Sequence, residues 1–497
     1  MTVETAARTS ARDRASAPDP AGSRREPDPA PPQNPVGKVV RDVLFNVEHA
    51  SRLPPGVPWR KLGFQLQLMR NPVATLVDCH RRFGGVFTVP AGPQLMVMVT
   101  APEAIREIQV DKADAFNWRG GAFGEMSALL GLGILTSDGE LHDRARRLMD
   151  PAFHRARMEE HLALIFAEAA AAVDALEPGA AVDVNAWARD LTMRIAMRAL
   201  VGFDESQEAT AALAAEHFET ALAAFGGNFG RLLRGPGSAW HAMQKSKKVL
   251  EKIVADHIAV TRARPEPGAD LVSILVETTF DDGSSYTDEE IASQVMTLLF
   301  AGHDTTSSTL AFLMYELARN STIQDGVRAQ IREIAGRRAP GTPLHLGFGD
   351  LMGSIPRLST SIDETLRLYP PVWIGARQAA RDVTIGGHRI PAGTPVNYLP
   401  WITHHLPELW DDPESFRPDR FTPENRATIP QGAYVPFGGG ARICLGQRFG
   451  LTVSHAVAAT LLGRFRMETT PDTRLKVANT PTLTPVGGLM LRPTQVP

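Results

Sequence analysis

Cysteine is scarce in this sequence of 497 residues, which contains only Cys79 and Cys444. Two cysteines cannot build the disulfide framework of a small secreted domain, so we expect a reducing compartment, the cytoplasm. Net charge is also small, at −3 with 52 basic and 55 acidic residues. This balance gives no overall attraction to nucleic acid or to an anionic membrane, and we expect no nucleic-acid partner.

The first 37 residues lack a long apolar run. They are rich in Ala, Arg, Ser, Asp and Pro, which is typical of a disordered tail and fits neither a signal-peptide core nor a transmembrane anchor. Arg24 and Arg25 precede Glu-Pro-Asp-Pro instead of the apolar run of an export signal. The sequence therefore predicts a tail over residues 1–37 and a single domain over residues 38–497.

The pattern of the rest predicts a mainly α fold with small β-sheets at its ends. Residues 84–100 contain two strand-like segments with a turn at residues 90–93, and residues 155–335 follow a helical pattern. Short strand signals return over residues 381–399, and we expect a C-terminal hairpin that turns at residues 487–488.

One long helix stands out in the helical part. Thr287 precedes three acidic residues in a capping-box pattern, and a periodic apolar run continues to about Asn320. A helix of about 33 residues would span roughly 50 Å and cross the molecule. The residues A-G-H-D-T-T at 301–306 place glycine and polar side chains near its middle. Gly302 weakens the helix and Thr305 competes for a backbone carbonyl, so we expect a kink or an opened turn there.

A glycine-rich loop near the C-terminus holds the second cysteine. Its pattern is F-x-x-G-x-R-x-C-x-G, formed by Phe437, Gly440, Arg442, Cys444 and Gly446. Glycines let the backbone approach a flat ligand closely, and the arginine adds positive charge. Metal and nearby cations favour the thiolate, which is the ligating form of cysteine. We interpret Cys444 as a candidate axial ligand to haem iron, with a buried structural cysteine as the alternative.

This loop resembles the signature of the cytochrome P450 family, and the resemblance extends from about Val39 to the C-terminus. It implies the cytochrome P450 fold, with the long central helix crossing the haem, and haem b as the cofactor, bound through Cys444. The A-G-x-D-T pattern of the helix is similar to the family's as well. By this resemblance Asp304 starts a proton relay and Thr305 takes part in oxygen activation, whereas His303 occupies a variable position and is not catalytic.

Two further groups of charged residues match the family. The resemblance implies that Glu364 and Arg367, three residues apart on one helix face, join Arg420 in a buried charge network behind the cysteine loop. It also implies cations that bind the haem propionates. These are His142, Arg146, Arg377 and Arg442.

The resemblance implies a haem-thiolate monooxygenase that inserts one oxygen atom from dioxygen into an organic substrate. No nucleotide-binding segment precedes residue 84 and 53 residues follow Cys444, so we expect electrons from a ferredoxin with its reductase or from a flavodoxin-type donor. A peroxide-driven peroxygenase is one alternative, against which the Asp304–Thr305 pair argues. A non-catalytic haem sensor or electron carrier is the other.

The stretches that line the family's substrate pocket are nearly all apolar here, which predicts a lipophilic substrate such as a terpenoid, a fatty acyl chain or a macrocycle. The predicted lining residues are Phe116, Trp118, Phe123, Leu129, Leu130, Phe300, Ala301, Val372, Trp373, Ile374, Pro485 and Val486.

Overall fold

The computed structural model describes residues 35–58, 61–121, 124, 126–225, 235–266, 268, 270–279, 283, 285–336, 344–479 and 482–495. The helices are α1 (Pro35–His49), α2 (Leu62–Arg70), α3 (Pro72–Phe83), α4 (Pro102–Arg106), α5 (Ser127–Leu130), α6 (Gly139–Met149), α7 (Arg155–Asp174), α8 (Val184–Ala196), α9 (Glu208–Leu222), α10 (Ala239–Arg262), α11 (Leu271–Glu277), α12 (Asp288–Arg319), α13 (Ser321–Ala335), α14 (Phe348–Gly353), α15 (Pro356–Leu368), α16 (Pro400–Thr403), α17 (Pro423–Arg426) and α18 (Gln447–Arg464). The strands are β1 (Val86–Ala91), β2 (Gln94–Val99), β3 (Phe116–Asn117), β4 (Val182–Asp183), β5 (Gly375–Ala379), β6 (Val383–Ile385), β7 (His388–Ile390), β8 (Pro395–Tyr398), β9 (Phe465–Thr469), β10 (Val477–Ala478), β11 (Thr484–Pro485) and β12 (Met490–Gln495). The predicted mainly helical fold with small sheets is confirmed.

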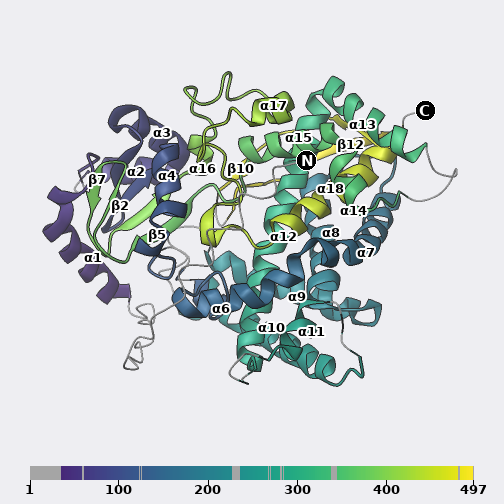
Figure 1. The fold of residues 1–497 in the computed structure, drawn as a ribbon, viewed down its shortest axis with the longest axis horizontal. Helices are drawn as coiled ribbons and strands as arrows, with labels where there is room; N and C mark the ends of the chain where they lie inside the picture. Colours follow the sequence, from purple (N-terminus) through teal and green to yellow (C-terminus); the bar gives the residue numbers. More distant parts are fainter. Residues whose placement is uncertain are drawn as a thin grey trace, which may run out of the picture.

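The largest sheet has the strand order β1-β2-β8-β5-β3. Its β1–β2 hairpin turns where the sequence predicts it, at a Gly92 with a φ of 64°. Strand β8 pairs parallel to β2, and β5 and β3 follow in antiparallel order. Figure 1 shows this sheet on the left, beside α1 and away from the main helical body.

The predicted C-terminal hairpin is corrected by the structure. Gly487 and Gly488 do have positive φ values of 78° and 84° and form the turn. The strands on either side of the turn pair elsewhere, however: β11 pairs with β10, and β12 joins β4 and β9 in a three-stranded sheet. The reason is length, because six-residue β12 aligns with five consecutive residues of β9, whereas β11 has only two residues to offer.

Helix α12 crosses the centre of the molecule, as predicted (Figure 1). Its N-terminus is held by the predicted capping box, in which the Thr287 hydroxyl accepts from the Glu290 amide and the Glu290 carboxylate accepts from the Thr287 amide. Both bonds satisfy amides that the first helical turn leaves without partners. The helix is buried along most of its length, so it forms the axis around which the other helices pack.

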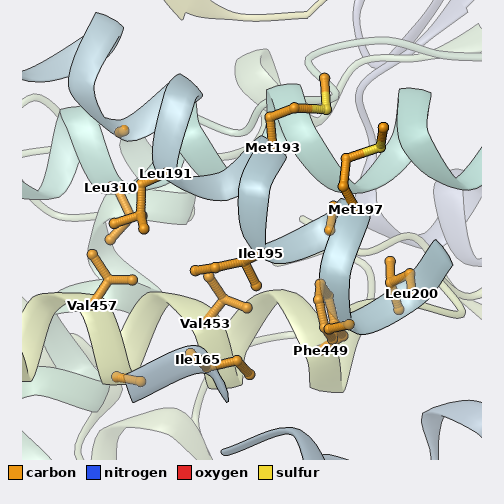
Figure 2. Packing of buried hydrophobic residues seen from close by; sticks show 14 of the residues in the cluster. Ile165, Leu191, Met193, Ile195, Met197, Leu200, Leu310, Phe449, Val453 and Val457 are labelled. Carbon is orange, nitrogen blue, oxygen red and sulfur yellow. The ribbon is translucent and has the colours of Figure 1, made fainter. Parts of the chain in front are cut away.

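The main hydrophobic core lies where α7, α8, α12 and α18 meet. Figure 2 shows Leu191 and Ile195 of α8 with Leu310 of α12 and Val453 of α18 in this core. These residues are at most 1% exposed. The same α18 begins immediately after the cysteine loop, so the core fixes the position of that loop.

The structure contains the buried contacts between Glu364, Arg367 and Arg420 that the resemblance implied. Glu364 and Arg367 of α15 are fully buried and form two hydrogen bonds of 2.8 Å with each other. Arg420 approaches the same carboxylate, with its Nε 3.4 Å from Glu364 Oε1. Arg367 also donates to the backbone carbonyls of His404 and Pro413, both at 2.8 Å. The network therefore joins α15 to the segment that leads into the cysteine loop.

The N-terminal prediction is only partly within the described residues. Residues 1–34 lie outside them, and α1 already begins at Pro35, inside the predicted tail of residues 1–37. Asn46 of α1 donates to the Pro93 carbonyl and accepts from the Leu95 amide, which fastens α1 to the β1–β2 turn. Within the described ranges, no helix combines the length and the apolarity that crossing a membrane requires.

Candidate active site

A cavity of about 1810 Å³ lies inside the molecule. The cysteine loop forms one of its walls and the middle of α12 forms another. Further walls come from residues 117–121, 126–128 and 131–135 with the exception of residue 133, from residues 371–376 at the start of β5, and from one face of α10. The cavity extends as far as α1, where Val39 and Phe45 line it.

Glycine geometry sets the shape of the cysteine loop. Gly440 has a φ of 64°, and a Cβ atom at this position would lie 1.9 Å from the Gln109 carbonyl oxygen. Gly438 has a φ of 69°. The Cys444 amide donates to the Phe437 carbonyl at 2.9 Å and closes the loop. A residue other than glycine at 440 would therefore be strained and would also clash with the backbone.

The Cys444 side chain is exposed, and the surface that it presents lines the cavity. Protein nevertheless surrounds the thiol closely enough for burial to raise its pKa. The amides of Gly446 and Gln447, at the start of α18, and the charge of Arg146 act in the opposite direction and lower that pKa. A helix N-terminus and a cation favour a thiolate, so these groups offset part of the effect of burial on the thiol pKa.

Three of the four predicted propionate-binding residues line the cavity: His142, Arg146 and Arg442. His142 and Arg146 lie on α6, and the Arg146 guanidinium donates to the Ile443 carbonyl of the cysteine loop. Burial, and after it Arg442, lowers the pKa of His142. Burial also lowers the pKa of Arg442, to about 10. An anion in the cavity would offset the cost of this burial, since it would stabilise the charged forms of His142 and Arg442.

Arg377, the fourth predicted residue, is not among the residues that line the cavity. It is buried on β5, where its guanidinium carbon lies 3.8 Å from the Trp118 ring centroid. Burial lowers its pKa. Arg377 thus contacts Trp118, which itself lines the cavity, and a contact of Arg377 with a propionate stays a prediction.

Asp138, just before α6, is a site residue that the sequence reasoning missed. Its carboxylate accepts from the Trp118 and Arg119 amides, each at 2.9 Å. It also accepts from Arg442 Nη2 at 2.8 Å. The sequence does not show which backbone amides a carboxylate will accept from. The one available signal was an acidic residue four positions before His142. Asp138 therefore connects the cavity wall at Trp118 and Arg119 to Arg442 of the cysteine loop.

The sequence predicts a kink or an opened turn at residues 301–306. Helix α12 runs without interruption through them, so the opened turn is absent, and the kink stays a prediction. The predicted competition for a carbonyl is present, since the Thr305 hydroxyl donates to the Ala301 carbonyl at 2.9 Å. This bond adds to the helix instead of breaking it, because a carbonyl oxygen can accept two hydrogen bonds. Thr305 lines the cavity, but Asp304 is buried and does not.

The apolar lining is partly as predicted. The predicted residues that line the cavity are Trp118, Phe300, Ala301, Val372, Trp373 and Ile374. Leu129 and Leu130 belong to the main core, Phe116 packs against the sheet, Pro485 and Val486 are not on the cavity wall, and Phe123 lies outside the described residues. Sequence reasoning missed the face of α10 formed by Trp240, Gln244 and Lys247, whose spacing of four and three residues is the available signal.

These features fit a haem. The cavity is large, mostly apolar and flanked by cations, with a single thiol facing into it from a loop that admits no Cβ at residue 440. A soft sulfur donor suits iron, and the cations suit the two carboxylates of protoporphyrin. The fold and the site together define a haem protein with a thiol beside the haem-binding cavity.

Comparisons with known proteins also indicate a haem protein. The model of the family described as "Cytochrome P450" matches residues 52–495. The chain is 31% identical to "Cyclooctat-9-en-7-ol 5-monooxygenase" of Streptomyces melanosporofaciens, over 86% of this chain and 93% of that one. It is 29% identical to "Pentalenene oxygenase" of Streptomyces avermitilis, over 85% and 92% of the two chains. The solved structure of retinoic acid bound cyanobacterial CYP120A1 has a TM-score of 0.80 and 25% identity, and the match covers 89% of this chain and 99% of that one.

The chain belongs to the cytochrome P450 family. It is a cytochrome P450 monooxygenase, an oxidoreductase whose cofactor is haem b.

Proposed function

We propose that the protein inserts one oxygen atom from dioxygen into a lipophilic small molecule, and that Cys444 would hold the haem iron through its thiolate. The observation that carries this proposal is the Cys444 thiol, which faces the cavity beside two amides of α18 and Arg146. When bound, haem supplies the activation of dioxygen and the electron chemistry.

The chain's own residues would bind and orient the cofactor. His142, Arg146 and Arg442 lie on the cavity wall, where they can neutralise the propionates by charge-assisted hydrogen bonds. Arg377 would contribute from its position against the Trp118 ring. Phe437 and Gly446 line the cavity and would form the face of the cysteine loop toward the flat ligand. Gly440 is not on the cavity wall, and it would contribute by letting the loop approach the Gln109 carbonyl.

An apolar cavity wall supports a lipophilic substrate. Phe300, Val372, Trp373 and Ile374 line the cavity near α12 and the start of β5, and burial of apolar surface is worth about 25 cal/mol per Å². Two relatives are named for cyclooctat-9-en-7-ol and pentalenene, and the solved relative holds retinoic acid. These names support a terpenoid or a fatty acyl chain over a small, multiply charged metabolite.

Cytochromes P450 take electrons from a redox partner. For this chain we propose a ferredoxin with its reductase or a flavodoxin-type donor. We also propose a cytoplasmic location, since Cys79 and Cys444 are both free thiols and free thiols persist in reducing compartments.

The test is the absorption spectrum of the reduced carbon monoxide complex, whose Soret band moves far to the red with a thiolate ligand. Cys444→Ser should abolish this band. Cys79→Ser should keep it, because Cys79 is a buried residue of α3 whose pKa burial raises to about 11. A normal band in the Cys444 variant would refute the assignment of Cys444 as the iron ligand.

Turnover then separates the reaction classes. Retinoic acid, pentalenene and dodecanoic acid are suitable first probes, ranked by the spin-state shift that each causes in the wild-type protein. Product formation with NAD(P)H and redox proteins supports the monooxygenase. Turnover with peroxide alone would favour a peroxygenase, and binding without any product would favour a sensor.

A further inference from the structure

Asp304 and Thr305 are adjacent in sequence, but they have different surroundings. Thr305 lines the cavity, and its hydroxyl donates to the Ala301 carbonyl at 2.9 Å. The Asp304 side chain is 6% exposed and is absent from the cavity wall. A proton held by Asp304 therefore needs another group to carry it into the cavity.

Thr482 provides that group. Its hydroxyl donates to Asp304 Oδ2 in a short hydrogen bond, and the residue lines the cavity while being only 5% exposed. Thr482 lies between β10 and β11, 178 residues from Asp304 in sequence. The Leu483 amide donates to the Pro371 carbonyl at 2.8 Å and holds the segment in place.

The other side of Asp304 leads to the protein surface. Arg189 of α8 has its Nη2 4.0 Å from Asp304 Oδ1 and 3.1 Å from Glu219 Oε1 of α9. The Glu219 side chain is 54% exposed. Burial lowers the pKa of the neighbouring His303 to about 4, so its imidazole is neutral near pH 7 and adds no positive charge beside Asp304. Polar groups thus connect the surface to the cavity through Asp304 and Thr482.

We propose that Thr482 is the proton-relay residue that links Asp304 to the cavity. The inference rests on the proposed oxygen-activating function and adds a residue that acts beside Asp304. A hydroxyl is suited to this role since it can donate one hydrogen bond and accept another at the same time.

The proposed proton transfer leaves Thr482 chemically unchanged. When Asp304 is protonated, its carboxyl donates a proton to Thr482 Oγ1, and the proton already on Oγ1 passes to an acceptor in the cavity. One O–H bond forms on Thr482 as another breaks, so the threonine is unchanged and Asp304 is left as a carboxylate. Asp304 then takes a proton from solvent on the Glu219 side. In this carboxylate state the Thr482 hydroxyl donates to Asp304, which is the arrangement observed.

The test compares Thr482→Val with Thr484→Val in the haem-loaded protein. The two changes are identical in chemistry, and Thr484 is also buried, but its hydroxyl has no hydrogen-bond partner within the described residues. With the probe that gives the largest spin-state shift, Thr482→Val should form product roughly 10–100-fold more slowly and release more peroxide per NAD(P)H. Thr482→Ser should restore coupling, which is the amount of product formed per NAD(P)H consumed. Thr484→Val should behave as wild type. Equal coupling in the two valine variants would overturn the relay.

A measurement without turnover tests the contact itself. The infrared band of the Asp304 carboxyl group can be assigned as the difference between wild type and Asp304→Asn. It should shift in Thr482→Val and stay in place in Thr484→Val, and an unshifted band would overturn the proposal. If Asp304→Asn is slow but Thr482→Val is not, the relay fails and the proposed function stands. If the wild-type protein forms no product, the proposed function fails and the relay fails with it.

Discussion

The two sides of the cavity are built in different ways. On the cysteine side, Gly440, Arg442 and Cys444 lie within five consecutive residues, and backbone geometry fixes their positions. On the α12 side, the polar groups come from α8, α12 and the segment before β11, and they meet only in the folded protein. The comparison shows that the geometry of the cysteine side is specified by local sequence, whereas the geometry of the α12 side is specified by tertiary packing.

The largest expected effect is on the network that supports the cysteine side. Arg367→Ala would leave the fully buried Glu364 without its bidentate partner, which should cost about 3–5 kcal/mol of unfolding free energy. Urea unfolding would measure this loss. Arg381→Ala is the control because the Arg381–Asp114 pair is solvent-exposed, and its loss should cost less than about 1 kcal/mol. Equal costs for the two variants would contradict the network's role.

The second prediction concerns the backbone of the loop itself. Gly440→Ala should abolish haem binding, because it adds a clash with the Gln109 carbonyl to the cost of a positive φ. Gly92→Ala has the same φ of 64° with open space around it, so it should cost only about 1–2 kcal/mol. Haem titration of the two variants separates clash from strain. Normal haem content in the Gly440 variant would show that the loop can widen.

On the α12 side we expect functional loss without unfolding. Thr305→Ala should keep haem and probe binding but should lower the yield of product per electron pair by about ten-fold, with peroxide as the new product. Thr309→Ala removes the equivalent hydroxyl one turn along, which donates to the Thr305 carbonyl at 2.8 Å, and should have less effect. Peroxide assays distinguish them. If coupling is normal in both variants, Thr305 only supports the helix.

The smallest effect should come from the start of α12. Thr287→Ala removes the capping box and should cost about 1 kcal/mol of stability without changing the haem spectrum. Thr220→Ala, an exposed hydroxyl in α9 that caps no amide, should stay within about 0.5 kcal/mol of wild type. Thermal unfolding of the two variants is the measurement. A matching decrease in both would show that the capping box adds nothing.

The same contrast explains which features the sequence could predict. The cysteine loop, the Glu364–Arg367 pair and the capped long helix each depend on residues a few positions apart, and the structure contains all three. Thr482 could not be found in this way, since 178 residues separate it from its partner. Spacing in a sequence encodes local geometry and carries no record of which distant segment folds against it.

Long-range packing also decides two details that local patterns leave open. Arg377 contacts the ring of Trp118, which lines the cavity, and that contact joins β5 to a residue just beyond β3. The expected opened turn in α12 rested on the local weakness of Gly302. Burial of both flanking segments keeps the helix continuous there, because packing overrides propensity.

The parallel pairing of β2 with β8 also has a consequence for synthesis of the chain. Met98 pairs with Asn397, so about 300 residues must be translated before β2 gains its second neighbour. At about 5–20 residues per second, that wait is roughly 15–60 s. During it, a mostly buried apolar strand, Q-L-M-V-M-V, presents an open edge on the nascent chain, and open edges of this kind invite aggregation. Yield on expression should therefore depend on how quickly ribosomes reach residue 398 and on whether a chaperone covers the edge until then.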